Sequence, residues 1–178
     1  MVFRFDPDLL RCLMRVPLAW IKWMGVVLCL ILGVWLYLLW QPERQVERHT
    51  LNLLGRTSAR NWPKVTVMMS ADYRDRWGHD RATAINNARE LFSHFFALHL
   101  VPMGPLDVSL DGQEASSTAP LEIFGSGTAL AHGVMAKLRE LEKPFVFRWQ
   151  KNGIWPWQWV LVGVDQEELF PGRTFPLD

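Results

Sequence analysis

Cysteine is scarce in this chain of 178 residues and occurs only at Cys12 and Cys29. Both lie before residue 41, so no disulfide can brace the remainder of the chain. That remainder, residues 41–178, is long enough for one domain with its own apolar core and too short for two comfortable ones. A domain without bridges is more typical of a bacterial periplasmic protein than of a small eukaryotic secreted one.

Neither sign of charge is in excess after residue 40. From Gln41 onward the sequence contains 15 Lys plus Arg and 16 Asp plus Glu, which gives 15 − 16 = −1. A nucleic-acid surface needs a basic stripe, so we expect no nucleic-acid partner. Walker, HExxH and CxxC motifs are absent, the five histidines are scattered, and Gly125-Ser126-Gly127 lacks the third glycine of a dinucleotide loop. We therefore expect neither a metal nor a cofactor.

Charge is also missing from Trp23 to Trp40, a continuous apolar run. Roughly 18 apolar residues suffice to cross a bilayer core as a helix, and a buried helix of a globular protein rarely runs so long without a polar face. Extension back to Pro17 adds Lys22, whose charge can reach the headgroups. A cleaved signal peptide would end in small residues, whereas this run ends in Leu-Tyr-Leu-Leu-Trp. The pattern predicts an uncleaved signal anchor over 17–40.

Basic residues flank the start of this predicted span at Arg4, Arg11, Arg15 and Lys22. Positive flanks stay on the cytoplasmic side, which predicts a single-pass protein of the bacterial inner membrane. Its parts are then a cytoplasmic tail over 1–16, a transmembrane helix over 17–40 that contacts the lipid bilayer, and an extracytoplasmic, periplasmic domain over 41–178. We expect this domain to fold without the span.

Helical signals come first in the domain. Apolar residues recur at helical spacing from Val46 to Thr57 after Pro42. Asn61-Trp-Pro predicts the start of a second, short helix, which a segment ending at Gly78 closes. Asp80 is a typical N-cap for a third helix, whose apolar stripe runs from Ala84 to Phe96.

Strand signals follow. Apolar residues alternate over 98–101 and 106–110, Asp111-Gly112 predicts a hairpin, and 114–131 suits a strand with a bulge at Gly125 and Gly127. Residues 132–143 fit either a short helix or a loop, and further strands are expected over 145–149 and 157–162. Helices followed by hairpin-connected strands predict an α+β fold, with three helices on one face of a curved antiparallel sheet.

Two stretches resemble the nuclear transport factor 2-like superfamily. They are N-W-P-x-V…M-S-A-D-Y-R-D-R-W-G-H-D-R over 61–81 and P-F-V-F-R-W-Q-K-N-G-x-W over 144–155. The resemblance covers about 43–165 and implies a cone, in which three helices are cupped by a strongly bent antiparallel sheet. That superfamily includes ketosteroid isomerases, dehydratases, transport adaptors and secretion-system subunits, so its fold does not select a function. Its members often dimerise through the outer sheet face.

An enzyme of this superfamily would place an Asp, His or Tyr inside the cone. The candidates are Asp72, Tyr73, Asp75 and His94, since a carboxylate in an apolar cavity can act as a base and a phenol can donate to an enolate oxygen. A structural reading competes with this one. Asp72 and Asp75 flank arginines and suit a solvated turn, while Tyr73 and Trp77 suit the mouth or the core of the cone.

Three further tryptophans, Trp155, Trp157 and Trp159, are candidates for binding a partner or an apolar ligand, together with Tyr73 and Trp77. We expect Trp157 and Trp159 to share one face of the last strand and Trp155 to lie near the turn. The three either fill the concave core or form an exposed aromatic patch.

Two functions follow. The favoured one is a non-enzymatic, membrane-anchored interaction or assembly module with a protein partner or a second copy, a layout similar to assembly subunits of type IV secretion systems. The alternative is a small-molecule-binding protein, or an isomerase or dehydratase, that uses the cone cavity for a small apolar or carbonyl ligand.

Overall fold

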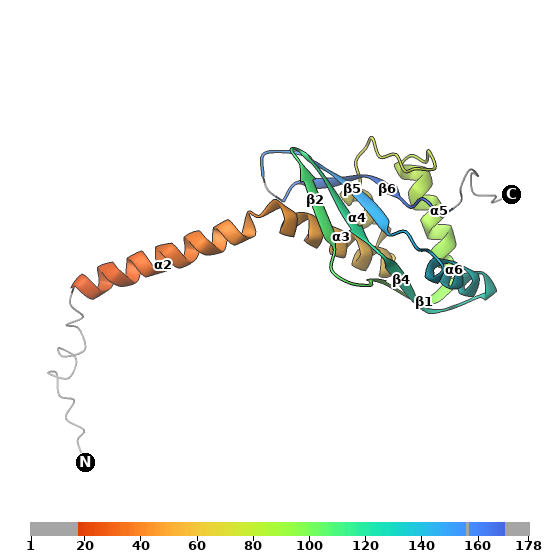
Figure 1. Cartoon of the computed structure of the whole chain (residues 1–178), viewed down its shortest axis with the longest axis horizontal. Coiled ribbons are helices and arrows are strands. Elements are labelled where there is room, and N and C mark those ends of the chain that lie inside the picture. The colour runs from red at the N-terminus through yellow and green to blue at the C-terminus, as the bar shows by residue number, and fades with distance from the viewer. Residues whose placement is uncertain (1–17, 156, 170–178) are drawn as a thin grey trace, which may run out of the picture. The chain divides into compact units, whose positions relative to one another are not determined.

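The computed structural model describes residues 18–155 and 157–169, which divide into two units between Trp40 and Gln41. The first unit is the helix α2 (Leu18–Leu39) (Figure 1). Every described side chain from Lys22 to Tyr37 is exposed. Within the described residues no one helix is both long and apolar enough to span a bilayer by itself, and Lys22–Tyr37 and Pro42–Ser58 reach that length only in combination, across a break.

Three helices open the second unit: α3 (Pro42–Ser58), α4 (Trp62–Met68) and α5 (Arg81–Ser93). Both predicted caps are confirmed. The side chain of Asn61 accepts a hydrogen bond from the Lys64 N–H at 3.4 Å, and that of Asp80 accepts one from the Thr83 N–H at 2.8 Å. The third helix ends at Ser93 rather than near Phe96, because Phe95 and Phe96 begin a strand that buries the first ring and exposes the second.

Six strands follow in the described part of the domain and form two antiparallel sheets. One sheet pairs β1 (Phe95–Pro102) with β4 (Leu121–Gly127), and the other has the order β2-β3-β5-β6. Its strands are β2 (Asp107–Asp111), β3 (Glu114–Ala119), β5 (Phe145–Lys151) and β6 (Trp159–Asp165). The hairpin at Asp111-Gly112 is confirmed, since Asp111 pairs with Glu114 and Gly112 has a φ of 60°. Only Pro120 separates β3 from β4, so one bent stretch of chain links the two sheets.

The predicted bulge lies on the neighbouring strand. The register of β1 and β4 shifts between Phe95 and Ala97, opposite Ser126 and Gly127, so β1 carries the extra residue. Gly125 serves a different purpose, because a Cβ there would lie 2.0 Å from the Ala97 carbonyl oxygen. The glycine therefore permits a close approach of two backbones.

A fourth helix of the domain, α6 (Ala129–Arg139), occupies the segment whose sequence fits a helix or a loop. The sequence predicts three helices for this domain, and its described residues form four. The helix buries Ala131 and Met135. The helix packs closely on β4, and Gly127 permits this approach, since a Cβ there would lie 2.5 Å from the Cβ of Ala131.

Residues 69–76 run along the edge of β6 instead of closing the second helix. The backbone N–H groups of Ser70, Arg74 and Arg76 donate to the carbonyls of Leu161, Val162 and Val164 at 2.8, 3.0 and 3.3 Å. An uncovered strand edge is a site of aggregation, and this segment covers the edge of β6.

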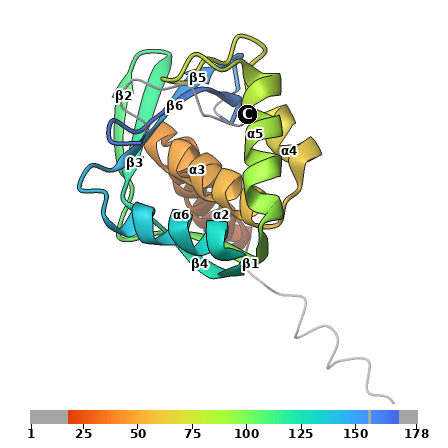
Figure 2. The same ribbon diagram turned by 90° about the vertical axis from the view of Figure 1, so that its right-hand side faces the viewer.

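The core of the domain lies between α3 and the strands. Figure 2 shows α3 in the middle of the domain, with α4 and α5 on one side and the strands of the larger sheet on the other. Among the described residues its largest fully buried apolar side chains are Trp149, Phe95, Leu161 and Val46. An α+β domain with helices packed on curved antiparallel sheets is thus confirmed.

Candidate functional site

The interior of the domain holds a chain of buried hydrogen bonds. The indole Nε1 of Trp149 donates to Ser117 Oγ at 3.1 Å, Ser117 Oγ and Thr50 Oγ1 lie 2.6 Å apart, and Thr50 Oγ1 donates to the Val46 carbonyl at 3.0 Å. Since Thr50 gives its only proton to Val46, Ser117 must donate to Thr50. No titratable side chain takes part in this chain, whose geometry fixes β3 and β5 against α3.

The predicted catalytic side chains do not converge. Tyr73 is buried in the core, and burial, helped by the nearby charge of Asp75, raises the pKa of its phenol. Asp72 is exposed beside it, and His94 lies half-buried at the C-terminal cap of α5. No hydrogen bond joins any two of these three side chains in the described part of the chain, so their catalytic role stays a prediction.

Asp75 organises the turn that leads from the segment along the edge of β6 to the start of α5. Its side chain is 4% exposed, and its Oδ1 accepts from the N–H groups of Trp77 and His79 at 3.0 and 2.8 Å. Its Oδ2 lies 2.9 Å from Nδ1 of His79. The expectation of a solvated, arginine-paired carboxylate is wrong for Asp75, because the backbone folds back over it and supplies the donors.

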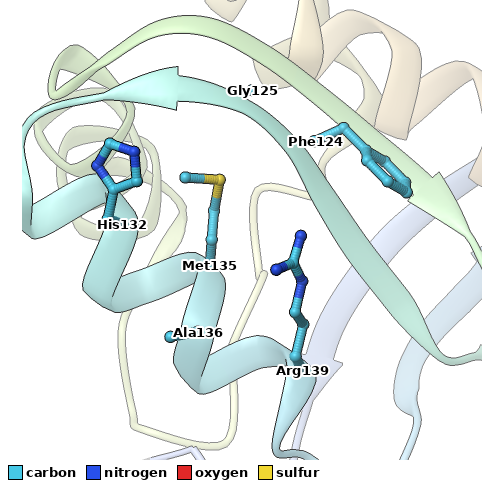
Figure 3. A pocket seen from close by; sticks show the side chains of 6 residues that line it. All are labelled: Phe124, Gly125, His132, Met135, Ala136 and Arg139. Carbon is cyan, nitrogen blue, oxygen red and sulfur yellow. The ribbon is translucent and has the colours of Figure 1, made fainter.

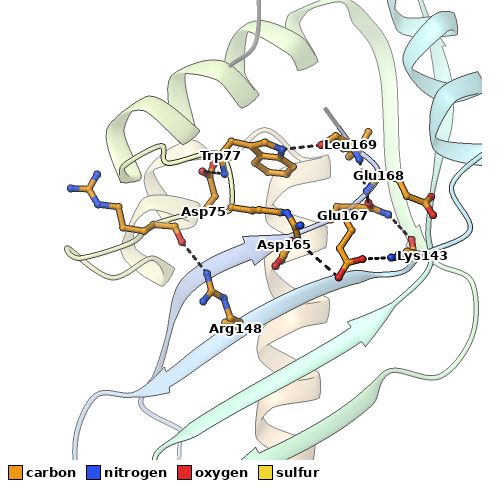
Figure 4. Close-up of polar contacts among 11 residues, drawn as sticks. Asp75, Trp77, Lys143, Arg148, Asp165, Glu167, Glu168 and Leu169 are labelled. Atoms are coloured by element: carbon orange, nitrogen blue, oxygen red, sulfur yellow. Dashed lines mark hydrogen bonds and ion pairs between the residues drawn. The ribbon is translucent and has the colours of Figure 1, made fainter. Parts of the chain in front are cut away.

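A second set of contacts fastens residues 165–169 to this turn (Figure 4). The indole of Trp77 donates to the Leu169 carbonyl at 2.9 Å, and Arg76 pairs with Asp165 at 3.0 Å. Gln166 is buried, with its amide donating to the Lys143 carbonyl at 2.5 Å. Trp77, which the sequence predicts to bind a partner, is half-buried, and its indole N–H is bound within the domain.

A cavity of about 290 Å³ opens between β4 and α6 (Figure 3). Its lining consists of Phe124, Gly125, His132, Met135, Ala136 and Arg139. None of these is a residue that the sequence singles out for binding, because the sequence leaves the helix α6 undecided. Arg139 donates from Nε to Glu122 Oε1 at 2.9 Å, and its guanidinium and the His132 ring give the lining of the cavity a mixed polar and apolar character.

The three tryptophans of the last hairpin separate into two environments. Trp159 begins β6 and is buried in the core. Trp155 and Trp157 lie in the connection between β5 and β6, where their rings stack with centroids 5.1 Å apart and planes at 14°. The prediction that Trp157 and Trp159 share a strand face is wrong, because strand pairing starts only at Trp159.

His49 joins α3 to this connection, a role that the sequence does not indicate. Its Nε2 lies 2.9 Å from the Trp157 carbonyl and must carry a proton, because a carbonyl only accepts. Its ring lies 5.8 Å from that of Trp149. Burial lowers the pKa of His49 from its ordinary value of 6.5, and this effect outweighs the hydrogen bond to Trp157.

We expect His49 to make the domain less stable in mild acid. A lowered pKa in the folded state means that the unfolded chain binds the proton more readily, so stability falls as the pH drops below about 6.5 and through the folded pKa. Thermal unfolding of the full-length protein at pH 7.5 and 5.5 measures the loss. His49→Gln keeps an N–H donor without a titrating ring and should show a smaller loss. An equal loss in both proteins would contradict the assignment.

Comparison with known proteins uses structure, since no protein-family model and no curated protein matches the sequence. The structure of Bd1075 from Bdellovibrio bacteriovorus superposes with a TM-score of 0.52 at 6% identity, covering 68% of this chain but only 38% of that protein. A nuclear transport factor 2-like superfamily protein from Salmonella enterica serovar Typhimurium superposes with a TM-score of 0.51 at 12% identity, covering 69% of this chain and 87% of that one. Identities this low show the fold alone. The domain that begins at Gln41 has the fold of the nuclear transport factor 2-like superfamily, as the two sequence motifs predict.

Proposed function

We propose that this protein is a single-pass, membrane-anchored interaction module, in which α2 holds the domain at the extracytoplasmic face of a bacterial inner membrane and the domain binds a protein partner. The observation that carries the proposal is the exposure of every described side chain from Lys22 to Tyr37. The 15 residues that follow Lys22 in this range carry no charge. A helix that is apolar on all sides gains most from a lipid environment.

The packed interior supports binding on the outer surface more than catalysis within the cone. Trp149, Phe95 and Leu161 fill the space between α3 and the strands. Tyr73 is one of these packed side chains, and Asp72 faces solvent. The alternative of a small-molecule enzyme would need a cavity that brings such groups together.

Charges placed in the middle of α2 should release the protein from the membrane. Each arginine at the centre of a spanning helix costs about 2.5–3.5 kcal/mol of insertion free energy, so Leu28→Arg with Leu32→Arg should leave the protein in the carbonate-soluble fraction of cells. The full-length wild-type protein should resist carbonate extraction.

The matched control is Leu28→Ile with Leu32→Ile, which keeps the helix apolar and should stay in the membrane. Removal of residues 1–40 should also yield a soluble fragment that melts cooperatively. A wild-type protein that carbonate extracts completely would overturn the anchor.

The partner is tested by crosslinking in living cells, followed by detergent extraction and identification of the captured chains. A different protein of the cell that co-purifies reproducibly supports the role as an interaction module, and a captured second copy would show that the protein assembles with itself. A protein that is always monomeric and captures nothing would overturn the interaction role.

A further inference from the structure

The connection between β5 and β6 exposes a group of apolar side chains that we name the tryptophan loop, consisting of Ile154, Trp155 and Trp157. Their exposed fractions are 94%, 52% and 51%. Single exposed apolar residues are common on proteins, but here a stacked tryptophan pair and the isoleucine that precedes it expose apolar area on the order of 400 Å² within one short loop, as much as the largest patch of many monomers.

The tryptophan loop lies at the end of the domain where the chain enters it. The hydrogen bond from His49 Nε2 to the Trp157 carbonyl places the loop against the second turn of α3. From His49 back to Pro42, where α3 begins, the helix rises about 10 Å. Figure 1 shows the β2–β3 and β5–β6 connections at the end of the domain where α3 begins. The loop is therefore close to the residue that the anchor precedes.

We propose that the tryptophan loop inserts into the headgroup layer of the membrane in which α2 is anchored. The inference rests on the proposed function, because the anchor brings the loop to the bilayer. The headgroup layer of one leaflet is roughly 5–8 Å thick, which is of the same order as the rise of about 10 Å along α3 between Pro42 and His49. Tryptophan rings favour this layer, where the apolar ring and the polar N–H both find partners.

The charges around the loop indicate that apolar contact, rather than attraction to anionic lipid, holds it. From Lys151 to Gln158 the sequence contains one lysine and no acidic residue. The neighbouring β2–β3 turn carries Asp111 and Glu114, which oppose an anionic surface. A tethered loop needs little affinity, since the anchor keeps its local concentration at the membrane high. Insertion fixes the tilt of the domain and directs the opposite end, with β1 and α6, away from the lipid.

The test places a fluorophore at Ile154 in the full-length protein. Cys12→Ser and Cys29→Ser remove the native thiols, and Ile154→Cys is labelled with an environment-sensitive dye after reconstitution in vesicles of phosphatidylcholine and phosphatidylglycerol. Lipid brominated on its acyl chains should quench this dye at least about twofold more than plain lipid. Trp155→Ala with Trp157→Ala should remove most of that quenching.

Phe96→Cys is the matched control, because Phe96 is 76% exposed and lies at the other end of the strands, where Phe95 pairs with Gly127. Its dye should not respond to bromination. Vesicle flotation of the same samples separates the two proposals. If the protein floats but the dyes at 154 and 96 respond equally, the loop inference is overturned and the anchor stands.

Two other outcomes also overturn the inference. A dye at 154 that is protected from both brominated lipid and aqueous iodide would place the loop against a protein partner or a second copy. A protein that fails to float would overturn the anchor and the inference together. Thermal melting of Trp155→Ala with Trp157→Ala should match the wild type, which confirms that a loss of quenching is not a loss of fold.

Discussion

Replacing Trp149 with alanine should lower the free energy of unfolding by about 4 kcal/mol. Removing a fully buried tryptophan costs about 3–5 kcal/mol, because the apolar contacts are lost and a cavity remains. Trp149 is 0% exposed and also donates from its indole N–H to Ser117. Its loss leaves the start of the buried hydrogen-bond chain without its donor. Denaturant unfolding of the full-length protein in detergent, followed by circular dichroism, measures the change.

Trp157 supplies the matched control within the same hairpin. Its side chain is half exposed, and its contact with His49 uses the backbone carbonyl, which alanine retains. Trp157→Ala should therefore change the unfolding free energy by less than about 1 kcal/mol. If both variants lost the same free energy of unfolding, burial of Trp149 in the core would not be what stabilises the domain.

The features that the sequence predicts correctly depend on contacts within a few residues. Asn61 and Asp80 cap helices because each side chain reaches an N–H group three residues ahead. Gly112 forms a hairpin because its backbone readily adopts a positive φ. Such signals act locally, so they need no knowledge of how the elements pack.

The features that the sequence predicts wrongly depend on tertiary pairing. Alternation from Trp157 to Trp159 predicts a common strand face, yet β5 pairs with β6 only as far as Trp159, and Trp157 stacks on Trp155 instead. Residues 69–76 follow a helix but extend along β6, because the unpaired edge of that strand offers carbonyl acceptors. Neither arrangement produces a periodic pattern of apolar residues from which it could be predicted.

The candidate binding surfaces also include one that the sequence predicts and others that depend on tertiary packing and are not predicted. The tryptophan cluster is visible in the sequence as a possible exposed patch, and Trp155 and Trp157 form one. His49 is not visible, because its partner Trp157 is 108 residues away and a lone histidine in a helix has no characteristic spacing. The cavity beside α6 is also missed, since its lining comes from two elements that pack only in the folded domain.

Replacing Asp75 with alanine should lower the free energy of unfolding by about 3 kcal/mol. The buried carboxylate accepts hydrogen bonds from the N–H groups of Trp77 and His79 and contacts the His79 ring. Each hydrogen bond to a charged group contributes about 1.5–3 kcal/mol, and alanine leaves the buried donors without an acceptor. The loss should extend to residues 165–169, which Trp77 holds through the Leu169 carbonyl.

Asp72→Ala is the control for Asp75, because Asp72 lies three residues away in the same segment and is exposed. It should cost less than about 0.5 kcal/mol, as is usual for surface positions. Asp75→Asn keeps one acceptor oxygen and should fall between the two. Hydrogen exchange at the Trp77 and His79 amides provides a second readout, since both should exchange faster in Asp75→Ala at unchanged pH. If these amides stay protected while the domain loses stability, the carboxylate does not organise the turn, and its contribution must come from elsewhere in the fold.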